Sequence, residues 1–363
     1  MRLQFHSLTA SFVFAAVAGA GSGSGCGADR SCDVALRWRA ETLRTVYSPP
    51  AGFYCYAPSV IRYGDTDYVF ACRNAQSYVI RDHICAFRWD GGRVSEFAVM
   101  LGPNPADGAW DSFHVCDPSV VAGRFRDGRR LYRYAMFYLG NDVDASRNNQ
   151  VGVAFSETLA GPWTRYGEPV VPDPQRGRWG TGQPSAISLD RDGHVLLFYT
   201  KGHGRAAGYV RELNLADLAH PVFGEETRLS TKGLTRTDGG PDVIANFDVA
   251  LDRKRQRFVA VRERRPYPTG QPSFIGEQIQ IVSLPAGELR ESDAEWRVEG
   301  EVTPAMTGFA RNHNAGIVRT PRGELPEDDR LTVFFASSET EPKLAGRFAA
   351  WTYALHEISA EWQ

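Results

Sequence analysis

The sequence lacks a strong charge of either sign. Its 41 basic and 43 acidic residues leave a formal net charge of -2, which excludes the strongly basic face that nucleic-acid-binding proteins present. It also lacks the cysteine spacing of a zinc site, a glycine-rich phosphate loop, a nucleophilic serine elbow and a redox Cys-x-x-Cys motif. No long amphipathic helical pattern follows the N-terminal region. We therefore expect the apolar segments of the chain to form β-strands.

An apolar run at the N-terminus is too short to span a bilayer as a stable helix. MRLQFHS carries one arginine, LTASFVFAAVAGA is apolar, and Ala18-Gly19-Ala20 fits a signal peptidase site. We therefore predict a signal peptide over residues 1–20, a leader or linker over 21–44, and a secreted or periplasmic protein without a transmembrane segment. Acylation at Cys26, as in a bacterial lipoprotein, is a minor alternative, and an ordinary buried segment is another.

Export permits disulfide bonds. The six cysteines allow 15 pairings, and the sequence alone does not select among them. Two pairs are plausible, Cys26 with Cys32 and, across a hairpin, Cys72 with Cys85.

Turn residues and aromatic residues are abundant, with 36 glycines, 21 prolines, 20 Phe, 14 Tyr and 8 Trp. They punctuate a recurring unit: a short apolar strand near Pro-Ser or its equivalent, a polar turn, and a second, aromatic-rich strand. Five such units start at positions that are 60, 66, 64 and 67 residues apart, namely Ala57, Asp117, Gln183, Phe247 and Asn314. Each unit has room for two further strands.

These units predict an all-β fold, a five-bladed β-propeller with four antiparallel strands per blade, over residues 45–363. A β-sandwich or a β-helix is the alternative. In a propeller the first strand of each blade lies innermost, so the five inner-strand starts surround one opening. The second-strand ends and the third-strand starts return to the same opening.

The polar residues that this geometry brings to the opening fall into three groups. At inner-strand starts lie Tyr56, His114, Asp117, Gln183, Asn246, Asp248, His313 and Asn314. At second-strand ends lie Arg73, Asn74, Asn141, Asp142, Lys201, His203, Arg262, Glu263 and Glu339. Near third-strand starts lie Arg81, Asp82, His83, Asn149, Gln150 and Glu277. Together with Trp110 and Tyr54 on loops, these carboxylates, amides, arginines and aromatic rings favour carbohydrate recognition.

The repeat and its Asp-Pro-Ser element resemble the five-bladed glycosidases of glycoside hydrolase families 43, 32, 68, 117 and 130. SETLAGPWTRYGEPVV is similar to their outer-strand phrase, and RNHNAGIV is similar to the Gly-His-Asn element of family 43. The resemblance implies that His313 helps to hold a cation, with calcium favoured, in the central channel. A buried histidine with satisfied hydrogen bonds is the alternative for His313.

The chain departs from that pattern at the positions where the family keeps its acids. The first-blade position is Ala57, the third-blade position is Gln183, and the fourth-blade position is Asn246-Phe247-Asp248. Asp117 alone matches, at the position of the transition-state-stabilising aspartate of family 32.

A glycosidase needs two carboxyl groups, one on each side of the scissile bond. The candidates for catalysis are Asp117, Asp248, Glu263 and Glu277. Each has a structural alternative: a turn aspartate, a buried aspartate bonded to amides, an ion pair whose neighbouring arginines lower the pKa of Glu263, and a solvated loop carboxylate. The candidates for substrate binding are Tyr56, Arg73, Trp110, His114, Asp142, Gln183, His203, Arg262 and Asn314. Arg73 and Arg262 would suit an acidic glycan.

We therefore predict an exported glycoside hydrolase that acts on a poly- or oligosaccharide, with inversion favoured because the first-blade carboxylate is absent. The predicted partner is a carbohydrate and not a nucleic acid, and the sequence specifies no oligomeric state. The first alternative is a non-catalytic glycan-binding propeller that has lost the usual acids. The second is a structural or partner-binding propeller at the cell surface.

Overall fold

The structure is a computed structural model that describes residues 36–173, 175–202 and 206–363. Apart from the short helices α1 (Pro304–Thr307), η1 (Ala286–Glu288) and η2 (Ala349–Thr352), the regular elements in these ranges are β-strands. The predicted all-β class is confirmed. None of the helices in the described ranges has the length and apolarity that crossing a membrane requires. The predicted signal peptide, Cys26, Cys32 and His203 lie outside the described residues.

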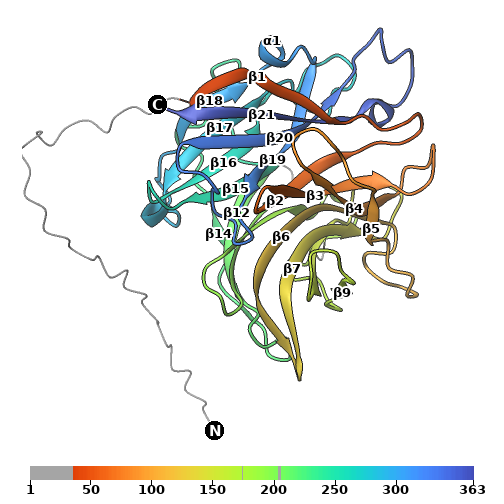
Figure 1. Cartoon of the computed structure of the whole chain (residues 1–363), viewed down its shortest axis with the longest axis vertical. Helices are drawn as coiled ribbons and strands as arrows, with labels where there is room; N and C mark the ends of the chain where they lie inside the picture. Colours follow the sequence, from red (N-terminus) through yellow and green to blue (C-terminus); the bar gives the residue numbers. More distant parts are fainter. Residues whose placement is uncertain (1–35, 174, 203–205) are drawn as a thin grey trace, which may run out of the picture. The chain divides into compact units, whose positions relative to one another are not determined.

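Three antiparallel sheets each comprise consecutive strands (Figure 1). One contains β6 (His114–Asp127), β7 (Arg130–Asn141), β8 (Gln150–Ser156) and β9 (Thr164–Arg165). The next contains β10 (Thr181–Ser188), β11 (His194–Lys201), β12 (Ala207–Asn214), β13 (Val222–Phe223) and β14 (Thr227–Arg228). The third contains β15 (Phe247–Asp252), β16 (Arg257–Glu263), β17 (Ile279–Pro285) and β18 (Arg297–Val302).

The fourth sheet has eight strands, which form two antiparallel groups. One group contains β2 (Tyr56–Tyr63), β3 (Thr66–Asn74), β4 (Asp82–Trp89) and β5 (Ala98–Leu101). The other contains β19 (Arg311–Arg319), β20 (Arg330–Ser338), β21 (Ala354–Trp362) and β1 (Leu36–Tyr47). A short parallel pairing, Val318 with Val60 and Arg319 with Ile61, joins the two groups.

Strand β1 begins earlier than the domain boundary predicted at residue 45. It pairs antiparallel with β21, with Leu36 opposite Trp362 and Tyr47 opposite Leu355, and the two strands lie side by side in Figure 1. Without β1, the backbone of β21 would be an unpaired sheet edge. Residues 36–44, predicted as part of a leader, therefore form the outer strand of a sheet.

Five hydrophobic clusters lie between the strand groups. The second strands of the groups are nearly continuous apolar runs, as in β11 and β20, because they are buried on both faces. One cluster joins β2–β5 to β6–β8, a second joins β6–β8 to β10–β12, and a third joins β10–β12 to β15–β17. A fourth joins β15–β17 to β19–β21, and the last joins β19–β21 back to β2–β4. The packing therefore returns from the last group to the first.

One residue at or near the start of each innermost strand has a left-handed backbone. Positive φ values between 44° and 53° occur at Ala57, Asp117, Gln183, Asn246 and Asn314. Such angles are uncommon for residues other than glycine, and here they recur once in each strand group. In four of the groups the register shifts at this residue, as a β-bulge does. This shared turn redirects each side chain at the strand start.

The buried guanidinium of Arg319 connects the inner strands. It donates to Ser59 (3.4 Å), Ser119 (3.2 Å) and Ser185 (3.2 Å) and lies 3.2 Å from Asp248 Oδ1. Three of these side chains also accept a backbone N–H from the next inner strand: Ser59 from Val120, Ser119 from Ala186 and Ser185 from Val249. Asp248 continues the series by accepting from Ile317. Side chains thus fasten each inner strand to the next.

The disulfide prediction for Cys72 was wrong in its partner. Cys72 bonds to Cys116, whereas Cys85 and Cys55 are free and buried. Cys72 and Cys85 lie on adjacent strands β3 and β4, but the register places Ile84 opposite Cys72 and Cys85 opposite Ala71. Successive side chains on a strand point to opposite faces, so this register keeps the two sulfur atoms apart.

Candidate functional site

A cavity of about 780 Å³ opens where the inner-strand starts converge. Each of the five strand groups contributes to its lining, for example Tyr56, Asp117, Gln183, Asn246 and Asn314. Aromatic side chains line part of it: Tyr54, Tyr267, Phe274, Phe348 and Tyr353. Polar groups line another part: Asn141, Asp144, Ser146 and Asn149. A second, narrow cavity of about 40 Å³ shares Asp117, Gln183, Asn246 and Asn314 with the first and adds Asp248.

Asp117 projects into this cavity from the start of β6. Burial, together with the negative charges of Asp82 and Glu263, raises its pKa to about 7, although the backbone N–H of Gln183 acts in the opposite direction. A carboxyl group with this pKa carries a proton in about half of the molecules near neutral pH. Asp117 therefore has the protonation behaviour that a general acid needs.

Asp82 is the second buried carboxylate that lines the cavity, at the start of β4. Tyr54 donates its hydroxyl to Oδ1 at 2.6 Å, and Tyr56 donates to Oδ2 at 3.3 Å. The backbone N–H of Asp82 donates to His114 Nδ1 at 3.0 Å, and the same ring nitrogen lies 3.1 Å from Asp82 Oδ2. These contacts fix the orientation of the Asp82 carboxylate in the wall of the cavity.

Glu263 ends β16 and is 3% exposed. Its Oε1 accepts the backbone N–H of Asn314 at 3.1 Å and the side-chain amide of Asn246, and Oε2 accepts the N–H of Gly276 at 3.0 Å. Burial raises the pKa of Glu263. The sequence had predicted a lowering by neighbouring arginines. The charge of Arg265 does lower the pKa, but burial outweighs it, and Arg262 and Arg264 bond to other partners. Glu263 therefore holds two residues of the cavity in place from behind.

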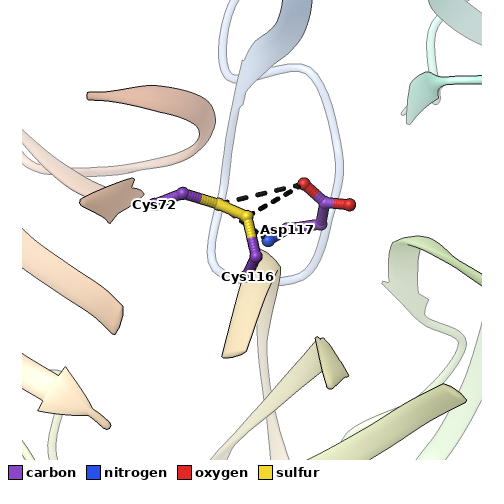
Figure 2. Close-up of side chains that lie close together, drawn as sticks. All are labelled: Cys72, Cys116 and Asp117. Atoms are coloured by element: carbon purple, nitrogen blue, oxygen red, sulfur yellow. Dashed lines mark hydrogen bonds between the residues drawn. A yellow bond between two sulfur atoms is a disulfide. The ribbon is translucent and has the colours of Figure 1, made fainter. Parts of the chain in front are cut away.

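The Cys72–Cys116 disulfide lies against Asp117, as Figure 2 shows. The backbone N–H of Asp117 donates to Cys72 Sγ at 3.0 Å. Oδ1 of Asp117 lies 3.4 Å from Cys116 Sγ and 3.8 Å from Cys72 Sγ. In the described part of the chain, these three residues form the single close group of three histidine, cysteine or acidic side chains. With both sulfurs in a disulfide, neither thiolate is free to bind a metal ion.

Five of the residues predicted from sequence for the site meet at the cavity besides Asp117, because they follow the converging strand starts. They are Tyr56, His114, Gln183 and Asn314 in the lining, and Glu263 behind it. Gln183 Oε1 accepts the N–H of Asn246 at 3.0 Å, and Asn314 donates to Asn246 Oδ1 at 3.2 Å. A chain of amide groups therefore runs around one side of the cavity.

The predicted catalytic residue Asp248 is buried below the cavity. Its Oδ1 accepts from Ser185 at 2.6 Å and its Oδ2 accepts the backbone N–H of Ile317 at 2.8 Å, while Arg319 balances its charge. Glu277 lies outside the lining, where its half-exposed carboxylate pairs with Arg311 at 3.0 Å. Neither carboxylate is free to face a substrate in the cavity.

Four predicted binding residues also lie outside the lining. Arg73 packs against the rings of Tyr47, Phe53 and Phe97, at 4.6 Å from the last. Arg262 is fully buried and donates to Asp242 at 2.7 Å. The two others have their own partners: Trp110 stacks on Tyr138, and Asp142 pairs with Arg176.

His313 is fully buried, and its Nδ1 lies 2.6 Å from Asn314 Oδ1. The His313 ring meets the Tyr353 ring edge-on. Burial lowers the pKa of His313 to about 4, so the ring is neutral at pH 7. Calcium requires six to eight oxygen ligands, and within the described residues His313 belongs to no group of three acidic, histidine or cysteine side chains. These surroundings do not fit calcium, and no step below uses a cation.

Several lining residues were not among the catalytic or binding candidates, although the sequence placed one of them, Asp82, at the opening. Asp82 stands at the third-strand start of the unit whose first-strand start is Ala57, so it returns a carboxylate to the group that lacks one. The strand repeat predicted that Asp82 lies at the opening. It did not predict that the hydroxyls of Tyr54 and Tyr56, which belong to another segment, orient the Asp82 carboxylate. Phe274 and Phe348 lie on long loops, for which the strand repeat gives no position.

The fold is similar to solved glycoside hydrolases at low sequence identity. Zg3597, a family 117 glycoside hydrolase of the marine bacterium Zobellia galactanivorans, matches with a TM-score of 0.59 and 11% identity over 91% of each chain. The α-L-arabinofuranosidase PaAbf62A of Podospora anserina, solved with cellotriose, matches with a TM-score of 0.56 and 13% identity over 90% of this chain and 97% of that one. The GH43_1 enzyme of Xanthomonas citri, solved with xylotriose, matches with a TM-score of 0.54 and 13% identity over 86% and 90%.

The sequence itself matches no protein-family model and no curated protein. The structural neighbours confirm the predicted resemblance for families 117 and 43 and add family 62, which the sequence did not indicate. At these identities the likeness concerns the fold. The chain therefore has the β-rich architecture of these glycoside hydrolases.

Proposed function

We propose that the protein is an exported glycoside hydrolase, built on a five-bladed β-propeller, that cleaves a poly- or oligosaccharide. The recurrence of the left-handed strand start in five strand groups supports the blade count. The five hydrophobic clusters, of which the last joins the final group to the first, support closure of the ring. In a closed propeller the cavity lies at one end of the central channel.

One observation carries the proposed reaction: Asp82 and Asp117, from neighbouring strand groups, face the same cavity in different environments. Asp117 is the general acid, because its raised pKa keeps a proton available for the departing oxygen. Asp82 is the base, because its carboxylate is held by two tyrosine hydroxyls and faces the cavity. Glu263 and Asp248 act indirectly, Glu263 by positioning Asn246 and Asn314, and Asp248 by fastening the inner strands.

We propose that the reaction inverts the anomeric centre. No carboxylate stands at Ala57, where a nucleophile would act from the first inner strand. Asp82 would instead activate a water molecule that attacks the sugar while Asp117 protonates the leaving oxygen. The experiment that tests stereochemistry is NMR of the first sugar product, which has the opposite anomeric configuration to the substrate if the reaction inverts.

A neutral glycan fits the cavity better than an acidic one. Among the described residues, the lining contains the carboxylates of Asp82, Asp117 and Asp144, and one arginine, Arg265. Arg73 and Arg262, which suggested an acidic glycan, contact other groups. Amides and aromatic rings supply the hydrogen bonds and flat apolar surfaces that neutral sugars need.

The test of this function is a screen of the purified protein against plant, algal and bacterial glycans, with detection of new reducing ends. Sugar release that is lost in both Asp117→Asn and Asp82→Asn supports hydrolysis at this site. Release that survives in Asp117→Asn removes that residue from the mechanism, and no release from any glycan contradicts the proposed activity.

Non-catalytic glycan binding is the second candidate, favoured by one observation. Ala57 and Gln183 occupy two strand starts at which the resembling enzymes carry acids, and both line the channel or cavity. Binding without release in the same glycan screen, measured by retardation of the protein in glycan-containing gels, would support this second function.

A further inference from the structure

The Cys72–Cys116 disulfide joins two strand groups at the catalytic cavity. Cys72 lies near the end of β3, and Cys116 lies near the start of β6, directly before Asp117. Both cysteines are almost completely buried, and Cys116 contributes to the cavity lining. The covalent bond therefore fixes the backbone next to Asp117 relative to the neighbouring group.

The disulfide contacts Asp117 at two places. Its Cys72 sulfur accepts the Asp117 N–H, which holds the left-handed backbone at this residue. Both sulfurs lie against Oδ1 of the carboxylate, as the dashed lines in Figure 2 mark. A disulfide sulfur has no hydrogen to donate, whereas a thiol is a weak donor. In the oxidised protein this side of the carboxylate is therefore covered without being hydrogen-bonded.

Four other elements bring groups toward Asp117. The carboxylates come from Asp82 at β4 and Glu263 at β16, and the backbone N–H of Gln183 comes from β10. The Tyr56 hydroxyl from β2 lies 3.2 Å from Cys116 Sγ and 3.3 Å from Asp82 Oδ2. The two negative charges and burial favour the protonated acid, and the Gln183 N–H favours the carboxylate. Any new hydrogen-bond donor beside Oδ1 would lower the pKa of Asp117 further, in the same direction as the Gln183 N–H.

We propose that the Cys72–Cys116 disulfide is a positioning element of the site, which fixes Asp117 and keeps further hydrogen-bond donors away from the side of its carboxylate at Oδ1. The catalytic meaning of this role rests on the proposed function, but the effect on Asp117 itself does not require hydrolysis. A dithiol reductant transfers two electrons to the S–S bond and becomes a disulfide, while each protein sulfur takes up a proton. The resulting thiols at Cys72 and Cys116 can donate to Oδ1, and the freed backbone admits water.

Both consequences of reduction stabilise the ionised carboxylate. The experiment is a ¹³C NMR titration of the aspartate carboxyl carbons in the full chain, oxidised and after reduction with dithiothreitol, in which Asp117→Asn identifies the signal. We expect the Asp117 midpoint to fall by about one pH unit or more on reduction. If the protein hydrolyses a glycan, the alkaline limb of its pH profile moves in the same direction.

Two double variants separate the role of the disulfide from effects of the reductant. Cys72→Ala/Cys116→Ala removes the bond without adding donors, so its midpoint falls less than that of Cys72→Ser/Cys116→Ser, and dithiothreitol changes neither. The matched control is Cys55→Ala/Cys85→Ala, which removes the two free buried cysteines. This control keeps the wild-type midpoint and the wild-type response to the reductant.

The proposal is overturned if the midpoint stays unchanged in reduced protein whose near-ultraviolet circular dichroism shows a native fold. It is also overturned if the reduced protein and both double variants unfold, because the bond is then a cross-link for the whole fold. Failure of the glycan screen with a shifted midpoint contradicts the proposed function and leaves the positioning role standing.

Discussion

Asp117 combines an unusual backbone with an unusual charge environment. Its positive φ turns the side chain into the cavity, and burial beside Asp82 and Glu263 favours its protonated form. Aspartate tolerates the left-handed conformation better than most residues. Among the five strand starts that share this left-handed backbone, two carry uncharged side chains, Ala57 and Gln183, at positions equivalent to Asp117. The backbone thus sets where a catalytic group can stand, and the side chain decides whether one does.

We expect Asp117→Asn to lower kcat about 10²- to 10⁴-fold, because it removes the proton donor and keeps the shape. Asp82→Asn should cause a similar loss. The two variants differ on an aryl glycoside with a good leaving group, whose departure needs little protonation: Asp117→Asn should then lose much less activity, and Asp82→Asn should lose as much as before. Steady-state kinetics on both substrates checks this, and equal losses for both variants on both substrates would contradict the assigned roles.

The rate should fall as the pH rises through about 7. A general acid works only while it is protonated, and the pKa of Asp117 is raised to about 7 by burial and by neighbouring negative charge. Below this pH the Asp117 carboxyl group is protonated, and above it kcat/KM should drop about tenfold per pH unit. A pH profile between 5 and 9 measures this limb. In Asp82→Asn one of the two negative neighbours is gone, so the limb of the residual activity should move to lower pH; an unchanged limb would contradict the contribution assigned to the Asp82 charge.

Among the secondary-structure elements, local pattern predicted the strands and their repeat, but not their edges or their cross-links. The inner and second strands carry their own signal, as in DPSVV and LTVFF. Strand β1 has few buried positions and pairs with a strand more than 300 residues away, so its own sequence gives weak evidence. The partner of Cys72 was missed because strand register, and not distance along the chain, decides which sulfurs meet.

The loops that border the cavity were the least predictable elements, because they follow no repeat. Phe274 and Phe348 come from two such loops, are 50% and 51% exposed, and stack with their ring centroids 6.3 Å apart. Both line the cavity. Exposed aromatic rings leave unfavourable contact with water when a ligand covers them, so we propose that this pair binds a sugar ring outside the proposed catalytic position.

We expect Phe274→Ala and Phe348→Ala each to raise KM for an oligosaccharide about three- to tenfold, the equivalent of about 0.7–1.4 kcal/mol of stacking. For a short aryl glycoside that does not reach the loops, KM should stay unchanged. Phe223→Ala is the matched control, since Phe223 is an exposed aromatic on β13 outside the lining. Equal effects on long and short substrates would contradict a binding role for the pair.

In the described body as a whole, a few side chains link strands that are far apart in sequence. Asp248 looked like a catalytic candidate because it follows an inner-strand start. Its role depends on Arg319, which lies 71 positions further along the chain on β19 and meets Asp248 where β19 packs beside β15. No local pattern links the two residues. Sequence therefore located the polar side chains at the strand starts, and only the contacts between strand groups separate those that line the cavity from those that hold the strands.

Arg319→Met should lower the free energy of unfolding by about 3–5 kcal/mol, because it leaves the Asp248 carboxylate buried without its counter-charge. Arg319 also donates to serines of three other inner strands, so the loss affects the whole ring. Adding Asp248→Asn removes the stranded charge, and the double variant should therefore be more stable than the sum of the two single effects predicts. Urea unfolding of the four proteins measures this coupling. Additive losses, or a loss below about 1 kcal/mol for Arg319→Met, would mean that the inner strands are held by their hydrophobic clusters alone.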